Sequence, residues 1–233
     1  MRHTIVKSHI LDVLAKAAPT SVASSFCLTS SILAEAPQDI QNLLSIYCDW
    51  SVLSYAVPIV DQSLWIWHRL DDQRYLFANH ILERAAAAIQ DQLSEDGIGV
   101  IDVARRFAGA VSLVELAVRA GLGSRGVNNL LLHQQFGSWL QLHALLINCT
   151  MADHQPLTTD VCTKCGLCIK ACPAGAISGK HFYPGRCSSL VASPWMPKSK
   201  AVALTAHSYI ECAECINSCP IGKPPEELFS WKR

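Results

Sequence analysis

The stretch Cys162-Thr-Lys-Cys165-Gly-Leu-Cys168-Ile-Lys-Ala-Cys172-Pro173 decides how the last third of this chain folds. A second run follows, Cys212-Ala-Glu-Cys215-Ile-Asn-Ser-Cys219-Pro220, and Cys187 lies alone between the two runs. Eight of the 11 cysteines are therefore gathered in this region. Eight thiolates are enough for two complete four-thiolate sites.

The spacing of the first run is that of bacterial ferredoxins, in which three cysteines bind one 4Fe–4S cube and the fourth binds another. We therefore assign the ligands crosswise. The first cluster takes Cys162, Cys165, Cys168 and Cys219, and the second takes Cys172, Cys187, Cys212 and Cys215. The alternative is a pair of zinc sites, but zinc sites more often show separate Cys-x-x-Cys pairs. Two cubes transfer single electrons, so the sequence predicts a redox protein.

Composition is that of a compact globular protein, because 50% of the 233 residues are hydrophobic and 16% are charged. The formal net charge is zero, but it is unevenly distributed. Residues 1–156 contain 10 Lys and Arg against 14 Asp and Glu, whereas residues 157–233 contain 9 against 5. The basic excess would offset the negative charge of the clusters. A nucleic-acid surface is the alternative, although these basic residues are scattered along the chain.

No stretch approaches the roughly 20 apolar residues of a membrane span, so we expect no membrane partner. The N-terminal segment is interrupted by Asp12, Lys16 and Pro19, unlike the apolar core of a signal peptide. A reducing cytoplasm suits free thiolates and oxygen-sensitive clusters, and we expect a cytoplasmic protein. Cys27, Cys48 and Cys149 are expected to be small buried hydrophobic residues.

The apolar periodicity predicts an α+β protein with two domains, residues 1–156 and residues 157–233, joined by a polar linker at 150–160. We expect helices at 5–17, 39–48 and 71–93, and a fourth that begins after the capping-box pattern of Ser112 and Glu115. Strands are expected at 51–60, 98–103, 129–133 and 139–148.

A glycine motif, Gly121-Leu-Gly123-Ser-Arg-Gly126, matches the G-x-G-x-x-G pattern. That pattern indicates dinucleotide binding only when it follows a strand and opens a helix. Here it follows a predicted helix and precedes a predicted strand, so we reject that interpretation. The motif is either a tight turn that approaches a large, flat ligand or a plain helix stop.

Asp71, Asp72, Arg74 and Tyr75 are close together near the start of the predicted helix at 71–93. Acidic residues there favour a helix N-terminus through its dipole, or they donate protons to a substrate. His68 and His80 are interpreted as surface residues, with a cleft as the alternative.

Several motifs together resemble one known group. Ala120-Gly-Leu-Gly-Ser-Arg-Gly126, Asn129-Leu-Leu-Leu-His133, Phe136-Gly-Ser138 and the cysteine array are similar to epoxyqueuosine reductases and their relatives, the corrinoid reductive dehalogenases. The similarity extends over about residues 51–222 and is closest to the short, ferredoxin-like members of the group.

The resemblance implies a nitroreductase-like α/β domain that holds cobalamin, followed by a bacterial two-cluster ferredoxin-like domain. It implies that the second cluster feeds electrons to the corrin, where a small or nucleoside-like substrate is reduced. By the same analogy, the corrin is bordered by Gly121, Gly123, Gly126, Asn129, Leu131 and His133. An external donor of the flavodoxin or ferredoxin type would supply the electrons.

The chain departs from the group in two respects. The family's proton-donating Asp aligns with Arg74, which leaves Asp72, displaced by two positions, and Tyr75 as the candidate catalytic residues. The family's C-terminal helical-repeat domain has no counterpart before Arg233, so we expect tRNA to be a doubtful partner. The segment before Ser51 is short, and a second copy of the chain could complete a cobalamin pocket as a homodimer. The alternative to a reductase is a non-catalytic electron carrier or corrinoid-handling protein.

Overall fold

The structure is a computed structural model that describes residues 2–29, 34, 37–70, 73–107, 109–151, 157, 159–187 and 202–222. It divides into two compact units, each made of separate stretches of chain. The first unit comprises 1–57, 81–123 and 141–159, and the second comprises 58–80, 124–140 and 160–233. This division differs from the boundary predicted after residue 156, because residues 58–80 and 124–140 join the cysteine region.

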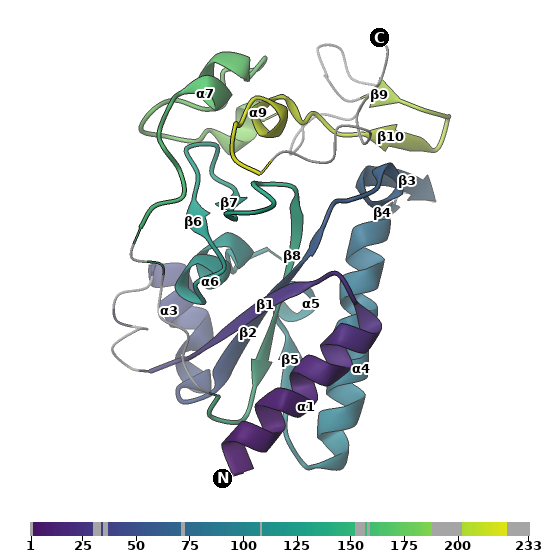
Figure 1. Cartoon of the computed structure of the whole chain (residues 1–233), viewed down its shortest axis with the longest axis vertical. Helices are drawn as coiled ribbons and strands as arrows, with labels where there is room; N and C mark the ends of the chain where they lie inside the picture. Colours follow the sequence, from purple (N-terminus) through teal and green to yellow (C-terminus); the bar gives the residue numbers. More distant parts are fainter. Residues whose placement is uncertain are drawn as a thin grey trace. The chain divides into compact units, whose positions relative to one another are not determined.

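A four-stranded sheet forms the centre of the first unit (Figure 1). Its strands lie in the order β1 (Val22–Cys27), β2 (Ser51–Pro58), β8 (Leu140–Ile147) and β5 (Val100–Asp102). β1 pairs with β2 and β5 with β8, both antiparallel. Every residue of β2 is buried, which agrees with the continuous apolar run expected of a central strand.

Helices cover both faces of this sheet. Three helices, α3 (Gln38–Leu44), α5 (Val103–Phe107) and α6 (Leu113–Arg119), pack on one face. They supply Leu44, Val103 and Leu116, respectively, to a core that also contains Phe26, Val52 and Leu146 of the strands. α1 (Arg2–Ala17) and α4 (Phe77–Glu95) cover the other face. There the Tyr55 hydroxyl donates a hydrogen bond to the Leu82 carbonyl of α4 at 2.9 Å. A short 3-10 helix, η1 (Ser45–Tyr47), follows α3.

The second unit contains a sheet whose strands come from distant parts of the sequence. The order is β4 (Gln73–Leu76), β3 (Ile66–Leu70), β10 (Ser208–Ile210) and β9 (Val202–Ala203). β6 (Ser124–Arg125) and β7 (Leu131–Leu132) form a separate antiparallel ribbon. The remaining elements are short helices: η2 (Gln62–Trp65), α7 (Leu167–Ala171), η3 (Pro184–Arg186) and α9 (Glu214–Asn217).

The start of the helix predicted at 71–93 is wrong. α4 begins at Phe77, and residues 73–76 form β4. Within this hairpin, Tyr75 lies opposite His68 and Leu76 lies opposite Trp67. Backbone pairing with β3 therefore determines the conformation of this segment, which the helical spacing of the apolar residues does not reveal.

The other predicted elements are present within a few residues of their expected ends. The sequence pattern did not predict the strands β1, β3, β6, β9 and β10, the short helix α5 (Val103–Phe107) or the short helices of the second unit. Ser112 caps α6 as expected, because its hydroxyl accepts a hydrogen bond from the Glu115 backbone N–H at 3.3 Å. The mixed α and β character of the chain is confirmed. None of the helices in the described ranges is both long enough and apolar enough to span a bilayer.

Candidate iron–sulfur site

The thiols assigned to the first cluster line one pocket of the second unit. Cys162, Cys165, Cys168 and Cys219 share this pocket with Gly126, Val127, Asn128 and Leu132. Burial raises the pKa of the Cys168 thiol, and repulsion from Cys162, Cys165 and Cys219 raises it further. Cys165 is exposed, so this group of thiols reaches the protein surface.

The thiols assigned to the second cluster form a more deeply buried group. Burial raises the pKa of Cys215 to about 12, with further contributions from Cys212, Cys187 and Cys172, and a smaller one from Cys168 of the first group. Burial also raises the pKa of Cys212, which is affected by Glu214, Cys187 and Cys172 as well. Cys162, Cys165, Cys168 and Cys219 thus share one pocket, and Cys172, Cys187 and Cys212 are electrostatic neighbours of Cys215. Within the described residues, no group of three or more His, Cys, Asp or Glu side chains has the spacing of a formed metal site, so the crosswise assignment stays a prediction.

This chemistry fits iron–sulfur clusters. Crowded, buried thiols stay protonated on their own, and metal cations bind the thiolate form and release the proton. The Ala176 backbone N–H also donates to Cys172 Sγ at 3.3 Å. Backbone N–H groups of Glu214 and Ile221 favour the thiolates of Cys212 and Cys219, respectively. Hydrogen bonds of this kind to cluster sulfurs raise the reduction potential.

Two glycines hold the end of the second cysteine run in place. A Cβ atom at Gly137 would lie 2.2 Å from the Ile221 carbonyl oxygen, and one at Gly222 would lie 1.8 Å from the Gly137 nitrogen. Both residues also have positive φ values, 58° and 59°. Only glycine fits this close approach of two main chains. The contact fixes the segment that follows Cys219.

The glycine motif has two structural roles. Gly121, with φ of 79°, ends α6, as the helix-stop interpretation predicts. Gly126 and Asn129 form the turn between β6 and β7, where the Asn129 N–H donates to the Gly126 carbonyl at 2.9 Å. Gly126 also lines the pocket of the first quartet. The motif follows a helix and opens a strand, which agrees with the rejection of dinucleotide binding.

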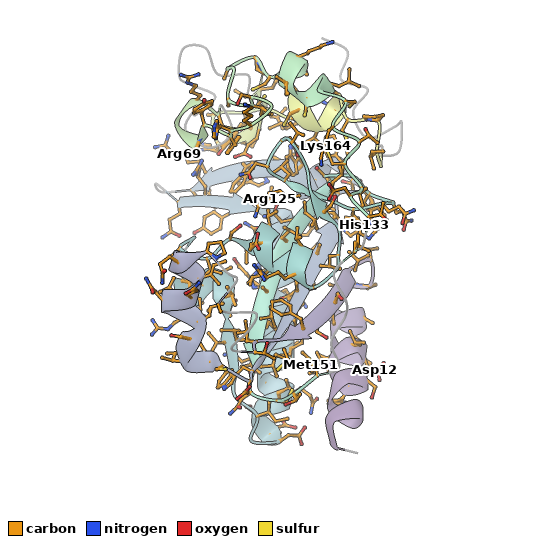
Figure 2. All side chains as sticks on the ribbon, turned by 90° about the vertical axis from the view of Figure 1, so that its left-hand side faces the viewer. Asp12, Arg69, Arg125, His133, Met151 and Lys164 are labelled. Carbon is orange, nitrogen blue, oxygen red and sulfur yellow. The ribbon has the colours of Figure 1, made fainter. Side chains whose placement is uncertain are left out.

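The six residues expected to border a corrin do not lie in one unit. Gly121 and Gly123 belong to the first unit, and the others belong to the β6–β7 region of the second. His133 and Leu131 lie at or beside β7, where the buried Leu131 pairs with Arg125 (Figure 2 labels Arg125 and His133).

His133 closes the turn that connects β7 to β8. Its Nδ1 atom accepts hydrogen bonds from the backbone N–H groups of Gln135 at 3.2 Å and Phe136 at 3.4 Å. The imidazole stacks on Phe136 with 5.2 Å between ring centroids. Burial lowers the pKa of His133, which keeps Nδ1 available as an acceptor. These contacts give His133 a structural role in the turn.

The two candidate catalytic residues gain little support. Tyr75 is an exposed residue of β4, and its hydroxyl donates to Gln73 Oε1 at 2.5 Å. Asp72 lies outside the described residues. His68 and His80 are both exposed, as expected.

Sequence reasoning missed several residues of the second unit that contact the cysteine region. The Ser124 hydroxyl accepts hydrogen bonds from the backbone N–H groups of Val161 at 2.9 Å and Cys162 at 3.4 Å, so it anchors the start of the first run. Glu211 precedes Cys212, and burial raises its pKa to about 7, although Arg74 and the Trp67 indole lower it. The position of Ser124 inside the glycine motif was the only available signal.

The first unit contains a buried polar pair that the sequence reading also missed. His143 Nε2 lies 3.1 Å from Asp102 Oδ1, but the contact lacks the geometry of a regular hydrogen bond. Burial opposes ionisation of Asp102, yet His143 and the backbone N–H groups of Arg105 and Ala104 outweigh it and lower its pKa. His143 also contacts the Tyr55 ring, with 5.3 Å between centroids.

Comparisons with known proteins agree with the cysteine pattern. The family described as "4Fe-4S double cluster binding domain" matches residues 161–222. An epoxyqueuosine reductase of Listeria monocytogenes is 40% identical over 117 residues, which cover 49% of this chain and 31% of that protein. A tetrachloroethene reductive dehalogenase of Dehalobacter restrictus is 31% identical over 122 residues, 47% of this chain and 22% of that protein.

A solved epoxyqueuosine reductase has the same fold. Its crystal structure, with an epoxyqueuosine-modified tRNA-Tyr stem loop, superposes with a TM-score of 0.64 at 16% identity, over 94% of this chain and 66% of that one. The chain spans less than half the length of the two curated relatives. The resemblance predicted from the motifs is therefore confirmed: this chain is similar to epoxyqueuosine reductases in sequence and fold, and residues 161–222 match a 4Fe–4S double-cluster domain.

Proposed function

We propose that the chain is an iron–sulfur oxidoreductase in which two 4Fe–4S clusters pass electrons from an external donor to a reducible group. The observation that carries this proposal is that Cys162, Cys165, Cys168 and Cys219 line one pocket, within a region that matches a 4Fe–4S double-cluster domain. When bound, the clusters supply one-electron transfer. The chain itself supplies the thiols, directs backbone N–H groups at some of their sulfurs, and partly buries the cysteines of the second quartet.

The substrate class is proposed from the relatives. A nucleoside-like substrate, reduced as in epoxyqueuosine reductases, agrees with the sequence similarity. Chain length was the ground for doubting tRNA. A relative of the same fold has been solved with a tRNA stem loop, so we correct that expectation and include a tRNA stem loop among the substrates to be tested. The flavodoxin- or ferredoxin-type donor, a homodimer and a cytoplasmic location remain predictions.

A corrinoid is a further proposal, and the described contacts give it limited support. Of the residues expected to border it, Gly121 ends a helix and His133 closes a turn through Nδ1. Gly126 lies beside the first quartet of thiols. These roles account for the three residues without a corrinoid, and we therefore derive no step through one.

A non-catalytic electron carrier is the second candidate function. Two observations favour it: position 74 is an arginine where the family has its acid, and the Tyr75 hydroxyl is bound to Gln73 on an exposed strand. Corrinoid binding separates the two functions. Uptake of cobalamin during anaerobic reconstitution would favour the reductase, and clusters without uptake would favour the carrier.

Anaerobic purification tests the cluster proposal directly. We expect about eight iron atoms and a similar amount of acid-labile sulfide per chain, with a paramagnetic signal after reduction by dithionite. A Cys48→Ala variant is the matched control, because Cys48 lies outside both quartets and should leave the iron content unchanged. A colourless protein that contains zinc and lacks sulfide would contradict the proposal.

A further inference from the structure

Four side chains of the second unit form a network between the β3–β4 hairpin and the strand that leads to Cys212. Trp67 of β3 lies opposite Tyr209 of β10, and their rings stack with 6.4 Å between centroids. The Arg74 guanidinium lies 5.6 Å from the centre of the Trp67 ring, and its Nη1 atom is 3.4 Å from the Tyr209 hydroxyl. Glu211, two residues after Tyr209, completes the network.

The Arg74 side chain contacts the segment that leads to the second quartet. Its contact with the Tyr209 hydroxyl at 3.4 Å joins it to a residue three positions before Cys212. Pairing of β10 with β3 holds that segment beside the hairpin, with Ile210 opposite Ile66. Arg74 therefore places a positive charge beside the segment that carries a proposed cluster ligand.

We propose that Arg74 is a positioning residue for the second cluster, which holds the Tyr209–Cys212 segment against the hairpin and raises the reduction potential of the cluster bound there. This inference rests on the proposed function, because it requires a cluster on the second quartet. A positive charge near a cluster stabilises the added electron, and net charge is one of the factors that set cluster potentials. Because Arg74 is exposed, solvent screens part of this effect.

Arg69 provides a matched control on the same face of the sheet. It lies directly opposite Arg74 in the β3–β4 pair, so both side chains project from one face. Its backbone N–H donates to the carbonyl of His207, which precedes β10 and is farther from Cys212 in sequence than Tyr209 is. Arg74, by contrast, contacts the side chain of Tyr209, three residues before Cys212. Removal of either arginine changes the net charge equally, and only one is placed to act on the second cluster.

The test is a redox titration of the anaerobically purified full chain, followed by electron paramagnetic resonance. In Arg74→Gln, we expect the reduced fraction of one cluster at a fixed potential to fall roughly threefold, with the other cluster unchanged. Arg69→Gln should change neither cluster to that extent. Arg74→Lys keeps the charge and should keep the wild-type potential. In a Cys215→Ala background, which removes the second cluster, Arg74→Gln should leave the remaining cluster unchanged.

Unchanged potentials in Arg74→Gln would overturn the inference, as would an equal shift of both clusters or an equal shift in Arg69→Gln. If Arg74→Gln does not load the second cluster, its potential cannot be measured and Arg74→Lys is compared with wild type instead. Wild-type loading and potential in Arg74→Lys would support the inference. Failure of Arg74→Lys to load the second cluster would overturn it. Absence of iron and sulfide from the wild-type protein would reject the proposed function itself, which distinguishes that failure from the others.

Discussion

Replacement of Glu211 by glutamine should make the stability of the folded protein less sensitive to a rise in pH. Burial raises the pKa of Glu211 from its ordinary 4.5 to about 7 in the folded chain. The folded state therefore holds this proton more tightly than the unfolded state does. Below pH 4.5 both states are protonated and the group has no effect. As pH rises from 4.5 to 7 the unfolded state ionises first, and stability falls.

The magnitude follows from the two pKa values. Linkage gives a destabilisation of about 1.4 kcal/mol at pH 5.5 and about 3.4 kcal/mol at pH 8.5 for a group shifted this far. The stability gap between Glu211→Gln and wild type should therefore widen by about 2 kcal/mol over this range, or roughly half as much if solvent screens the carboxyl. A negatively charged cluster on Cys212 would raise the pKa further and widen the gap.

Anaerobic denaturant unfolding of cluster-loaded protein at both pH values measures this gap. Differences in packing between glutamate and glutamine cancel, because they do not depend on pH. Arg74→Gln provides a second comparison: since Arg74 lowers the pKa of Glu211, its removal should extend the loss of wild-type stability to higher pH. A gap that stays constant with pH, or narrows as pH rises, would refute the assignment of a buried, proton-holding carboxyl.

Three further predictions concern the cysteine region. Cys215→Ala should reduce the iron content from about eight to about four atoms per chain and spare the first cluster; loss of both clusters would mean that the domain folds only when fully loaded. Gly137→Ala should cost roughly 2–4 kcal/mol in thermal unfolding, because its Cβ would lie 2.2 Å from the Ile221 oxygen. Gly97→Ala has a similar φ of 72° but open space around it, and should cost only about 1 kcal/mol. Ser124→Ala should cost about 1–2 kcal/mol and lower iron loading of the first quartet, because two backbone N–H groups lose their acceptor; unchanged loading would show that the anchor is dispensable.

The cysteine spacing indicated a double-cluster domain, which the family match to residues 161–222 confirms, because ligand spacing in ferredoxin runs depends on local geometry. The crosswise membership of the two quartets stays a prediction. Cys162, Cys165 and Cys168 are only three residues apart, and the Cys-Pro ends direct the fourth thiols to the other group. Local signals also located α6, whose cap and stop lie within its own sequence at Ser112 and Gly121. These predictions needed no knowledge of distant parts of the chain.

Features that depend on long-range pairing could not be predicted in this way. The segment before Phe77 continues the helical spacing of α4, but its pairing with β3 makes it a strand. The strand that contains His143 was predicted, but the burial of this residue beside Asp102 and Tyr55 depends on contacts with other elements. The environment of Glu211 could not be predicted from the sequence, because it depends on Trp67 and Arg74, more than a hundred residues earlier.

The pairing of β3 with β10 has a consequence for biosynthesis. Ser208 of β10 lies opposite His68 of β3, so β3 is synthesised about 140 residues before the strand with which it pairs. Cys212, Cys215 and Cys219 also emerge only after that partner. Neither quartet can be completed on a nascent chain that lacks them. Iron and sulfide delivery must therefore follow translation of this region, when β10 is already available to pair with β3.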